Sequence, residues 1–292
     1  AALITPAPRS SPARTAVPTI INQVLTTTPI STAVNGIPVT TIVVMPAAVQ
    51  QRVREVFTVG QSLGRDPRHF SKLGDSLVAS PSFLTRFDTG RYNLGVYNHL
   101  QPTIEHYAGS FGRYGIAIRV GLHAWAVFDP LWANKEFCEP NETLLACELR
   151  LYNPSVLLIN LGSNDDGPGA TFNKSVREIV DYCLANGVIP VLATKADRFE
   201  GEDNRNNLIM RQVAADYAIP LWDFDLVAET LPGRGLGEDQ VHLTSYGLYD
   251  YTEPIVFRHG YPVLDLTALM VLNGIWQTVA DLSGPAATPN SQ

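Results

Sequence analysis

The chain has 292 residues and a formal net charge of −7, with 45% of its residues hydrophobic and 17% charged. Lys and Arg form no cluster along the sequence, which argues against a nucleic-acid binder, because such a protein needs a basic face to neutralise phosphates. No apolar run approaches the roughly 18 residues of a membrane-spanning helix, so we expect no membrane span. The length and apolar fraction suit one α/β domain with long loops.

Both ends of the sequence are rich in Pro, Ala, Ser or Thr. Residues 1–18 read as a tail or linker and residues 283–292 as a disordered tail, which leaves a single domain over 19–282 with an N-terminal extension over 19–69. The sequence starts at Ala1 without a signal sequence, so either a signal peptide was removed or the chain was trimmed. We expect a secreted or cell-surface protein, or one unit of a longer secreted polypeptide.

The first half of the domain mixes short predicted elements with long loops. Alternation of apolar and polar residues on both sides of Asn35-Gly36 predicts a hairpin within 19–44. Hydrophobic periodicity then predicts, in chain order, a helix over 46–64, a strand over 70–73, a long loop over 81–112 with a helix over 101–107, and a strand over 116–120.

The second half is more regular. It predicts a helix over 144–151, a strand over 155–161, a helix over 172–185, a strand over 188–193, a helix over 206–217, a strand over 219–222 and a helix from Ser245 onwards. Buried apolar strands separated by helices indicate a parallel sheet that is covered on both faces. The sequence therefore predicts an α/β fold.

The three cysteines favour an exported protein. Cys138 and Cys147 flank the short segment EPNETLLA, and we expect a disulfide between them, while Cys183 lies in a helical pattern and is expected to be a buried thiol. The alternative is three reduced cysteines in a cytosolic protein. No CxxC or Cys/His cluster supports a structural zinc site.

Two polar clusters directly follow predicted buried strands. The strand in FSKLGDSL leads into Gly74-Asp75-Ser76, where a serine at a strand-to-helix turn exposes its hydroxyl beside free backbone N–H groups. In INLGSNDDG, the amide of Asn164 could donate to a developing oxyanion. The plainer interpretations are a helix N-cap and a loop of Asx turns. The carboxyl ends of parallel strands meet at one edge of a sheet, so these clusters are expected to lie together.

A third cluster, EDQVHLTSYG, lies in a late loop. Asp239 and His242 are three residues apart, which lets the carboxylate hold one ring nitrogen and leaves the other free as a base. The plainer interpretation is a surface histidine beside a helix cap.

Taken in this order, the three clusters resemble the motifs of the SGNH (GDSL) hydrolases, and the resemblance runs from about Phe70 to Tyr246. It implies a three-layer α/β/α, flavodoxin-like sandwich with a mostly parallel central sheet. It also implies that Ser76 is the nucleophile, that His242 is the general base and acid, and that Asp239 orients His242. The oxyanion hole would comprise the N–H of Ser76, the side chain of Asn164 and the N–H of a glycine. Neither a metal nor an organic cofactor is implied.

Two glycines could complete that set. Family members usually place it at the end of the second sheet strand, often beside an Asn. Gly121 ends the predicted strand GIAIRVG but lacks the Asn, whereas Asn93-x-Gly95 has the letters and lies in a loop. We expect Gly121.

Together these residues predict a serine esterase that forms an acyl-enzyme and acts on a small-molecule or polysaccharide ester. Small acyl groups, including acetyl groups on carbohydrate, are favoured. Asp75, His123 and Trp125 are expected near the substrate, although His123, Trp125 and Trp132 are equally consistent with ordinary packing. The aromatic-rich stretch 83–107 predicts either a sugar-facing rim or a packed loop.

Two other functions stay open. One is a metal-dependent phosphoesterase, which would need several metal-binding histidines. The other is a non-catalytic binding or structural module of the same fold.

Overall fold

In the computed structural model, which describes residues 31–282, a five-stranded sheet lies at the centre. The predicted tails over 1–18 and 283–292 lie outside the described residues. In spatial order the strands are β3 (Val43–Val44), β8 (Leu221–Trp222), β7 (Ile189–Ala193), β6 (Pro154–Asn160) and β4 (Asp66–Gly74). All neighbouring pairs are parallel except β3 with β8. The prediction of a mostly parallel sheet is confirmed.

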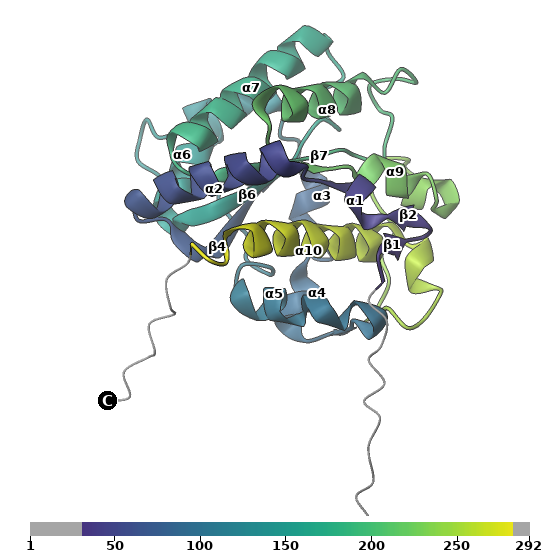
Figure 1. Cartoon of the computed structure of the whole chain (residues 1–292). Coiled ribbons are helices and arrows are strands. Elements are labelled where there is room, and N and C mark those ends of the chain that lie inside the picture. The colour runs from purple at the N-terminus through teal and green to yellow at the C-terminus, as the bar shows by residue number, and fades with distance from the viewer. Residues whose placement is uncertain (1–30, 283–292) are drawn as a thin grey trace, which may run out of the picture.

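Helices cover both faces of this sheet, as Figure 1 shows. Side chains alternate along β6, so that Val156 and Leu158 pack into one core cluster and Leu157 and Ile159 into the other. The first cluster is completed by α2 (Ala47–Ser62), α3 (Ser76–Ala79), α5 (Gln101–His106) and α10 (Gly260–Val279), and the second by α6 (Leu144–Tyr152), α7 (Gly169–Ala185) and α8 (Arg205–Tyr217). The three-layer α/β/α class is confirmed.

The hairpin predicted around Asn35-Gly36 is present but short. Strands β1 (Ala33–Val34) and β2 (Ile37–Pro38) pair antiparallel, and both turn residues have positive φ, as a tight hairpin turn requires. The remaining small elements are α1 (Val39–Ile42), α4 (Thr85–Thr89), β5 (Tyr92–Asn93), α9 (Phe224–Ala228), β9 (Tyr249–Asp250) and the 3₁₀ turns η1 (Gly95–Leu100), η2 (Ala124–Ala126), η3 (Pro130–Trp132), η4 (Pro232–Gly235) and η5 (Val256–Arg258).

The strand predicted over 116–120 is wrong. In this segment only Ile118 forms a bridge, in parallel with Gly74 at the end of β4. The carboxylate of Glu148 on α6 accepts the N–H groups of Ile116 at 2.6 Å and Ala117 at 3.3 Å. A buried side chain therefore satisfies amides that a neighbouring strand would otherwise satisfy.

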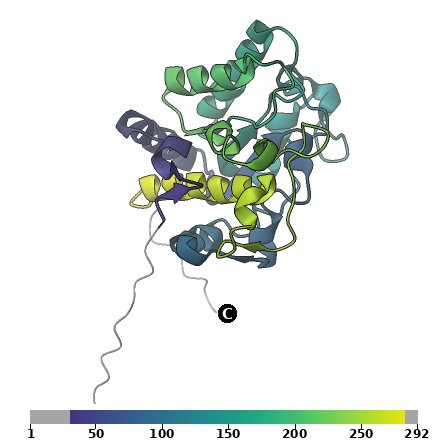
Figure 2. The ribbon, with the colours of Figure 1, turned by 90° about the vertical axis from the view of Figure 1, so that its right-hand side faces the viewer.

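The helix predicted from Ser245 is also wrong at its start, because α10 begins only at Gly260. Residues 249–250 instead form β9, which pairs in parallel with β5. Pro254 then disfavours a helical conformation in the residue before it. Figure 2 shows α10, in yellow, lying between the helices of the 85–106 region and the rest of the domain.

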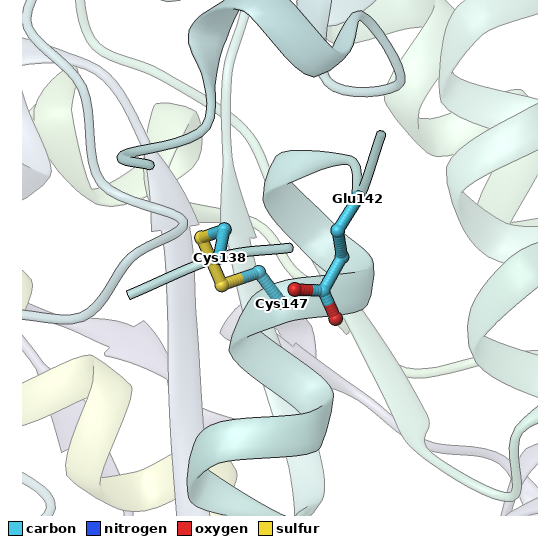
Figure 3. Close-up of side chains that lie close together, drawn as sticks. All are labelled: Cys138, Glu142 and Cys147. Carbon is cyan, nitrogen blue, oxygen red and sulfur yellow. A yellow bond between two sulfur atoms is a disulfide. The ribbon is translucent and has the colours of Figure 1, made fainter. Parts of the chain in front are cut away.

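The cysteine predictions are confirmed. Cys138 and Cys147 are joined by a disulfide, drawn in Figure 3, and Cys183 is a free, buried cysteine whose thiol pKa is raised to about 12 by burial. Within residues 31–282, no helix combines the length and the apolar character needed to cross a membrane.

Candidate active site

Ser76 is the first residue of α3, directly after the turn that ends β4. Asp75 caps this short helix by accepting the N–H of Leu77 at 3.0 Å. A Cβ atom on Gly74 would lie 2.2 Å from Val78 Cγ2 and 2.7 Å from the Asn160 carbonyl oxygen, so only glycine fits the turn. The sequence Gly-Asp-Ser therefore gives a sharp strand-to-helix turn with the serine hydroxyl at the carboxyl edge of the sheet.

His242 lies beside this hydroxyl. Its Nε2 atom is 2.9 Å from Ser76 Oγ, and its Nδ1 atom is 2.6 Å from Asp239 Oδ2. Asp239 also accepts the main-chain N–H groups of Val241 and His242 at 3.0 and 2.9 Å. The hydrogen bond from the His242 ring, followed by these two, lowers the pKa of Asp239 to about 2. The Asp239 carboxylate therefore stays ionised and holds the imidazole in one orientation.

Two backbone N–H groups near Ser76 are free to bind a negative charge. Neither Ser76 nor Gly121 donates its main-chain N–H to another residue within the described part of the chain. Gly121 adopts a φ of +75°, and Arg119, two residues earlier, donates its N–H to the Gly74 carbonyl at 3.0 Å. This contact ties the Gly121 segment to the end of β4, next to the serine.

The rival glycine, Gly95, is placed differently. Its N–H is already donated to Asn93 Oδ1 at 3.2 Å, and a Cβ atom there would lie 2.9 Å from the Thr252 side chain. Gly121 therefore offers a free donor that Gly95 does not.

Asn164 projects from the loop after β6 towards the same turn. Its Nδ2 atom donates to Asp75 Oδ2 at 3.1 Å and to the Leu122 carbonyl at 3.3 Å. The amide thus bridges the Ser76 turn and the Gly121 segment. Both of its hydrogens have protein acceptors, and the longer bond, to Leu122, is the one more easily exchanged for another acceptor.

Asp75 is fully buried, and each of its carboxylate oxygens accepts a hydrogen bond, one from Leu77 N–H and one from Asn164. Burial raises the pKa of this carboxyl to about 7, against the lowering effect of the Leu77 bond. The expectation that Asp75 contacts substrate does not fit this position, because the side chain faces Asn164 and not solvent.

His123 and Trp125 line a cavity of about 160 Å³ beside the Asn164 loop. Asp165, Asp166, Thr171 and Phe172 also contribute to its wall. Trp132 instead packs, partly buried, against the core cluster on the α7 face of the sheet. A second cavity of about 460 Å³ lies beside Asp239 and includes Phe199 in its lining.

The aromatic residues of the 83–107 stretch do not form a rim. Phe83, Phe87, Tyr97 and Tyr107 are each no more than 4% exposed and belong to the core cluster on the α10 face. Of the two interpretations of this stretch, the packed loop is the right one.

One group of three metal-ligand side chains lies close together within residues 31–282: Cys138, Glu142 and Cys147 (Figure 3). Its two sulfur atoms are bonded to each other, so they are not available as thiolates.

Glu148 is the residue near the site that the sequence did not reveal. Besides the N–H groups of the 116–117 segment, its buried carboxylate binds the Ser71 hydroxyl at 2.6 Å and the Arg113 guanidinium. The only signal in the sequence is an acidic residue within the apolar face of LLACELRLY.

No protein-family model matches the chain, and no curated protein matches it at a significant level. The chain is similar to several solved structures. A psychrotrophic esterase from a Pseudoalteromonas species is 16% identical and aligns over 70% of this chain and 99% of its own, with a TM-score of 0.46. An alpha/beta hydrolase from the Lake Arreo metagenome is 14% identical over 71% and 95%, with a TM-score of 0.48. A GDSL-like lipase from Bacteroides thetaiotaomicron is 14% identical over 78% and 98%, with a TM-score of 0.42.

Proposed function

We propose that this chain is a serine esterase that hydrolyses carboxylic esters through an acyl-enzyme on Ser76. The observation that carries the proposal is the continuous contact from Ser76 Oγ to His242 Nε2 at 2.9 Å and from His242 Nδ1 to Asp239 Oδ2 at 2.6 Å. A serine hydroxyl is a weak nucleophile until a base within hydrogen-bond reach takes its proton. This arrangement supplies that base and an anion that stabilises its protonated form.

In the first half of the reaction, Ser76 Oγ attacks the ester carbonyl while its proton passes to His242 Nε2. The carbonyl oxygen becomes an oxyanion, for which the donors are the N–H groups of Ser76 and Gly121 and the Asn164 amide. Asn164 exchanges its 3.3 Å bond to the Leu122 carbonyl for the oxyanion. The tetrahedral intermediate then collapses, the bond to the alcohol oxygen breaks, and His242 returns the proton to the leaving alcohol.

In the second half, water replaces the alcohol. His242 takes a proton from this water as its oxygen attacks the acyl carbon, and collapse releases the acid and returns the proton to Ser76. The side chains of His242 and Asp239 are 49% and 53% exposed, so water has direct access to the base.

We also propose small acyl groups as the acyl part and the cell exterior as the place of action. The disulfide between Cys138 and Cys147 supports an exported protein, because such bonds persist in oxidising compartments. The buried state of the aromatic 83–107 stretch removes the original basis for a carbohydrate substrate. Acetyl, butyryl and octanoyl esters of p-nitrophenol would test the acyl preference, and equal turnover of the octanoyl ester would contradict it.

The decisive experiment compares p-nitrophenyl acetate hydrolysis by the wild type and by Ser76→Ala, each with and without EDTA. We expect EDTA to leave the wild-type rate unchanged and the variant to lose about 10⁴-fold or more in kcat. Ser80→Ala is the matched control, since this hydroxyl accepts the N–H of Ser82 at 3.2 Å and makes no contact with His242.

Each contrary outcome points to a different function. Loss of activity with EDTA would favour a metal-dependent phosphoesterase. An inactive wild type on every ester tried would favour a binding module.

A further inference from the structure

The 160 Å³ cavity lies next to the groups that we assign to the oxyanion. Its wall includes His123 and Asp165, which directly follow Leu122 and Asn164, the two residues joined by the 3.3 Å hydrogen bond. Asn164 in turn bonds to Asp75, the residue before Ser76. The cavity therefore adjoins the Asn164 side of the proposed oxyanion hole.

The wall of the cavity combines an aromatic face with a free carboxylate. Trp125 is 53% exposed, and its ring stacks on His123 with 5.6 Å between ring centroids and 27° between ring planes. Both oxygens of Asp165 accept the N–H of Ala124, at 3.0 and 3.2 Å. The exposed carboxylate of Asp166, by contrast, makes no hydrogen bond to any residue between 31 and 282, so it can accept hydrogen bonds from a ligand.

This chemistry disfavours an alkyl chain as the occupant. Covering Asp166 and His123 with hydrocarbon would remove them from water without giving them new partners. A ring that carries hydroxyls can instead lay its C–H face on Trp125 and donate hydroxyl hydrogens to Asp166. The volume equals that of about five water molecules, which is room for one such ring.

We propose that this cavity binds the sugar ring that carries the ester, with Trp125 as the stacking surface and Asp166 as the hydroxyl acceptor. The inference rests on the proposed esterase function and names the alcohol part of its substrate. A carbohydrate substrate is thus supported by Trp125 and Asp166, which lie outside the buried 83–107 stretch.

The test compares kcat/KM on two acetyl esters, an acetylated methyl xyloside and p-nitrophenyl acetate, for the wild type, Trp125→Ala and Asp166→Asn. We expect each variant to lose about fivefold to tenfold on the xyloside and to keep its rate on p-nitrophenyl acetate within about twofold. The unchanged p-nitrophenyl acetate rate also shows that the variants fold. Phe199→Ala is the matched control, because Phe199 is similarly exposed, at 61% against 53% for Trp125, but lines the cavity beside Asp239.

Three results would overturn the inference. Equal losses on both esters would show that Trp125 has only a structural role. An altered preference among p-nitrophenyl esters from acetate to octanoate in Trp125→Ala would make the cavity an acyl pocket. An unchanged rate on the xyloside in both variants would show that neither Trp125 nor Asp166 contacts the sugar. If the wild type cleaves none of these esters, it is the proposed function that fails.

Discussion

The two sides of the candidate site hold their residues in opposite ways. On the His242 side, the contacts that orient the base lie within residues 239–242 and are exposed to solvent. On the Gly121 side, the segment 115–122 is fixed by Glu148, a buried residue some thirty positions further along the chain. One side is built from local hydrogen bonds and the other from a long-range buried contact.

Because of this difference, substitutions on the His242 side should lower activity, and substitutions on the Gly121 side should lower stability. Changes in an exposed loop affect the reaction and leave the free energy of unfolding nearly unaltered, because little is buried there. Removing a buried carboxylate that accepts several hydrogen bonds mainly lowers the free energy of unfolding, because its former donors stay buried without an acceptor.

The largest effect is expected from Asp239→Asn. The amide keeps the shape of the side chain but does not stabilise protonated His242, so kcat on p-nitrophenyl acetate should fall by about 10⁴-fold. The thermal unfolding midpoint should stay close to that of the wild type. Asp250→Asn, in another exposed turn where Asp250 accepts the Thr252 N–H at 3.0 Å, is the control and should keep full activity. A loss of less than about tenfold in Asp239→Asn would contradict the role of Asp239.

Next in size is the effect of Glu148→Ala on stability. It leaves Arg113 and the N–H groups of the 116–117 segment without their buried acceptor, so the free energy of unfolding in urea should fall by about 3–5 kcal/mol. Asp216→Ala is the control: it breaks a surface ion pair in which the Arg177 and Asp216 side chains are 31% and 38% exposed, and it should leave the free energy of unfolding nearly unchanged. Equal costs for the two variants would show that Glu148 does not anchor the segment.

Asn164→Ala tests the oxyanion assignment. Removing one donor should lower kcat by about 10²- to 10³-fold, with a small change in KM, because the donor acts mainly in the transition state. Asn173→Ala, which removes an amide from the surface of α7, is the control. A change in KM alone would place Asn164 in ground-state binding.

The effect that is smallest per pH unit concerns Asp75. The folded pKa of about 7 lies above the ordinary value of 3.8, so between these values the folded chain keeps a proton that the unfolded chain has lost. The free energy of unfolding should therefore fall as pH rises from about 4 to 7, by up to about 1.4 kcal/mol per pH unit for this group. Asp75→Asn should lack this contribution. Identical pH slopes for the variant and the wild type would contradict it.

Most of the regular elements could be predicted from the sequence because their signals are local. The helix over 206–217 and the strand over 188–193 follow from hydrophobic periodicity, and the structure places α8 and β7 there within a residue. The Asp239–His242 contact is visible for the same reason, since it spans three positions.

The failures have a common physical cause. Residues 116–120 carry a strand-like pattern, yet the N–H groups of Ile116 and Ala117 bond to the side chain of Glu148. Nothing near them in the sequence indicates this partner. Likewise, the two residues of β9 are held by β5, more than 150 positions earlier, and so α10 starts later than the pattern after Ser245 suggests. Tertiary contacts override local preference at both places.

Because the 116–120 segment pairs with β4 at only one residue, it also affects how readily one copy of the protein can associate with another. It leaves β4, a nine-residue strand, as the last strand on its side of the sheet, with one bridged residue on the outer edge among those described. Such an edge is a template for pairing with another chain and for aggregation. Here Pro67 offers no N–H, Phe70 donates its own to Ser110 Oγ at 3.3 Å, and the Lys72 ammonium binds the Phe111 carbonyl at 2.7 Å. The loop around residues 110–111 thus covers part of this edge and hinders edge-to-edge association, and it also packs in the core.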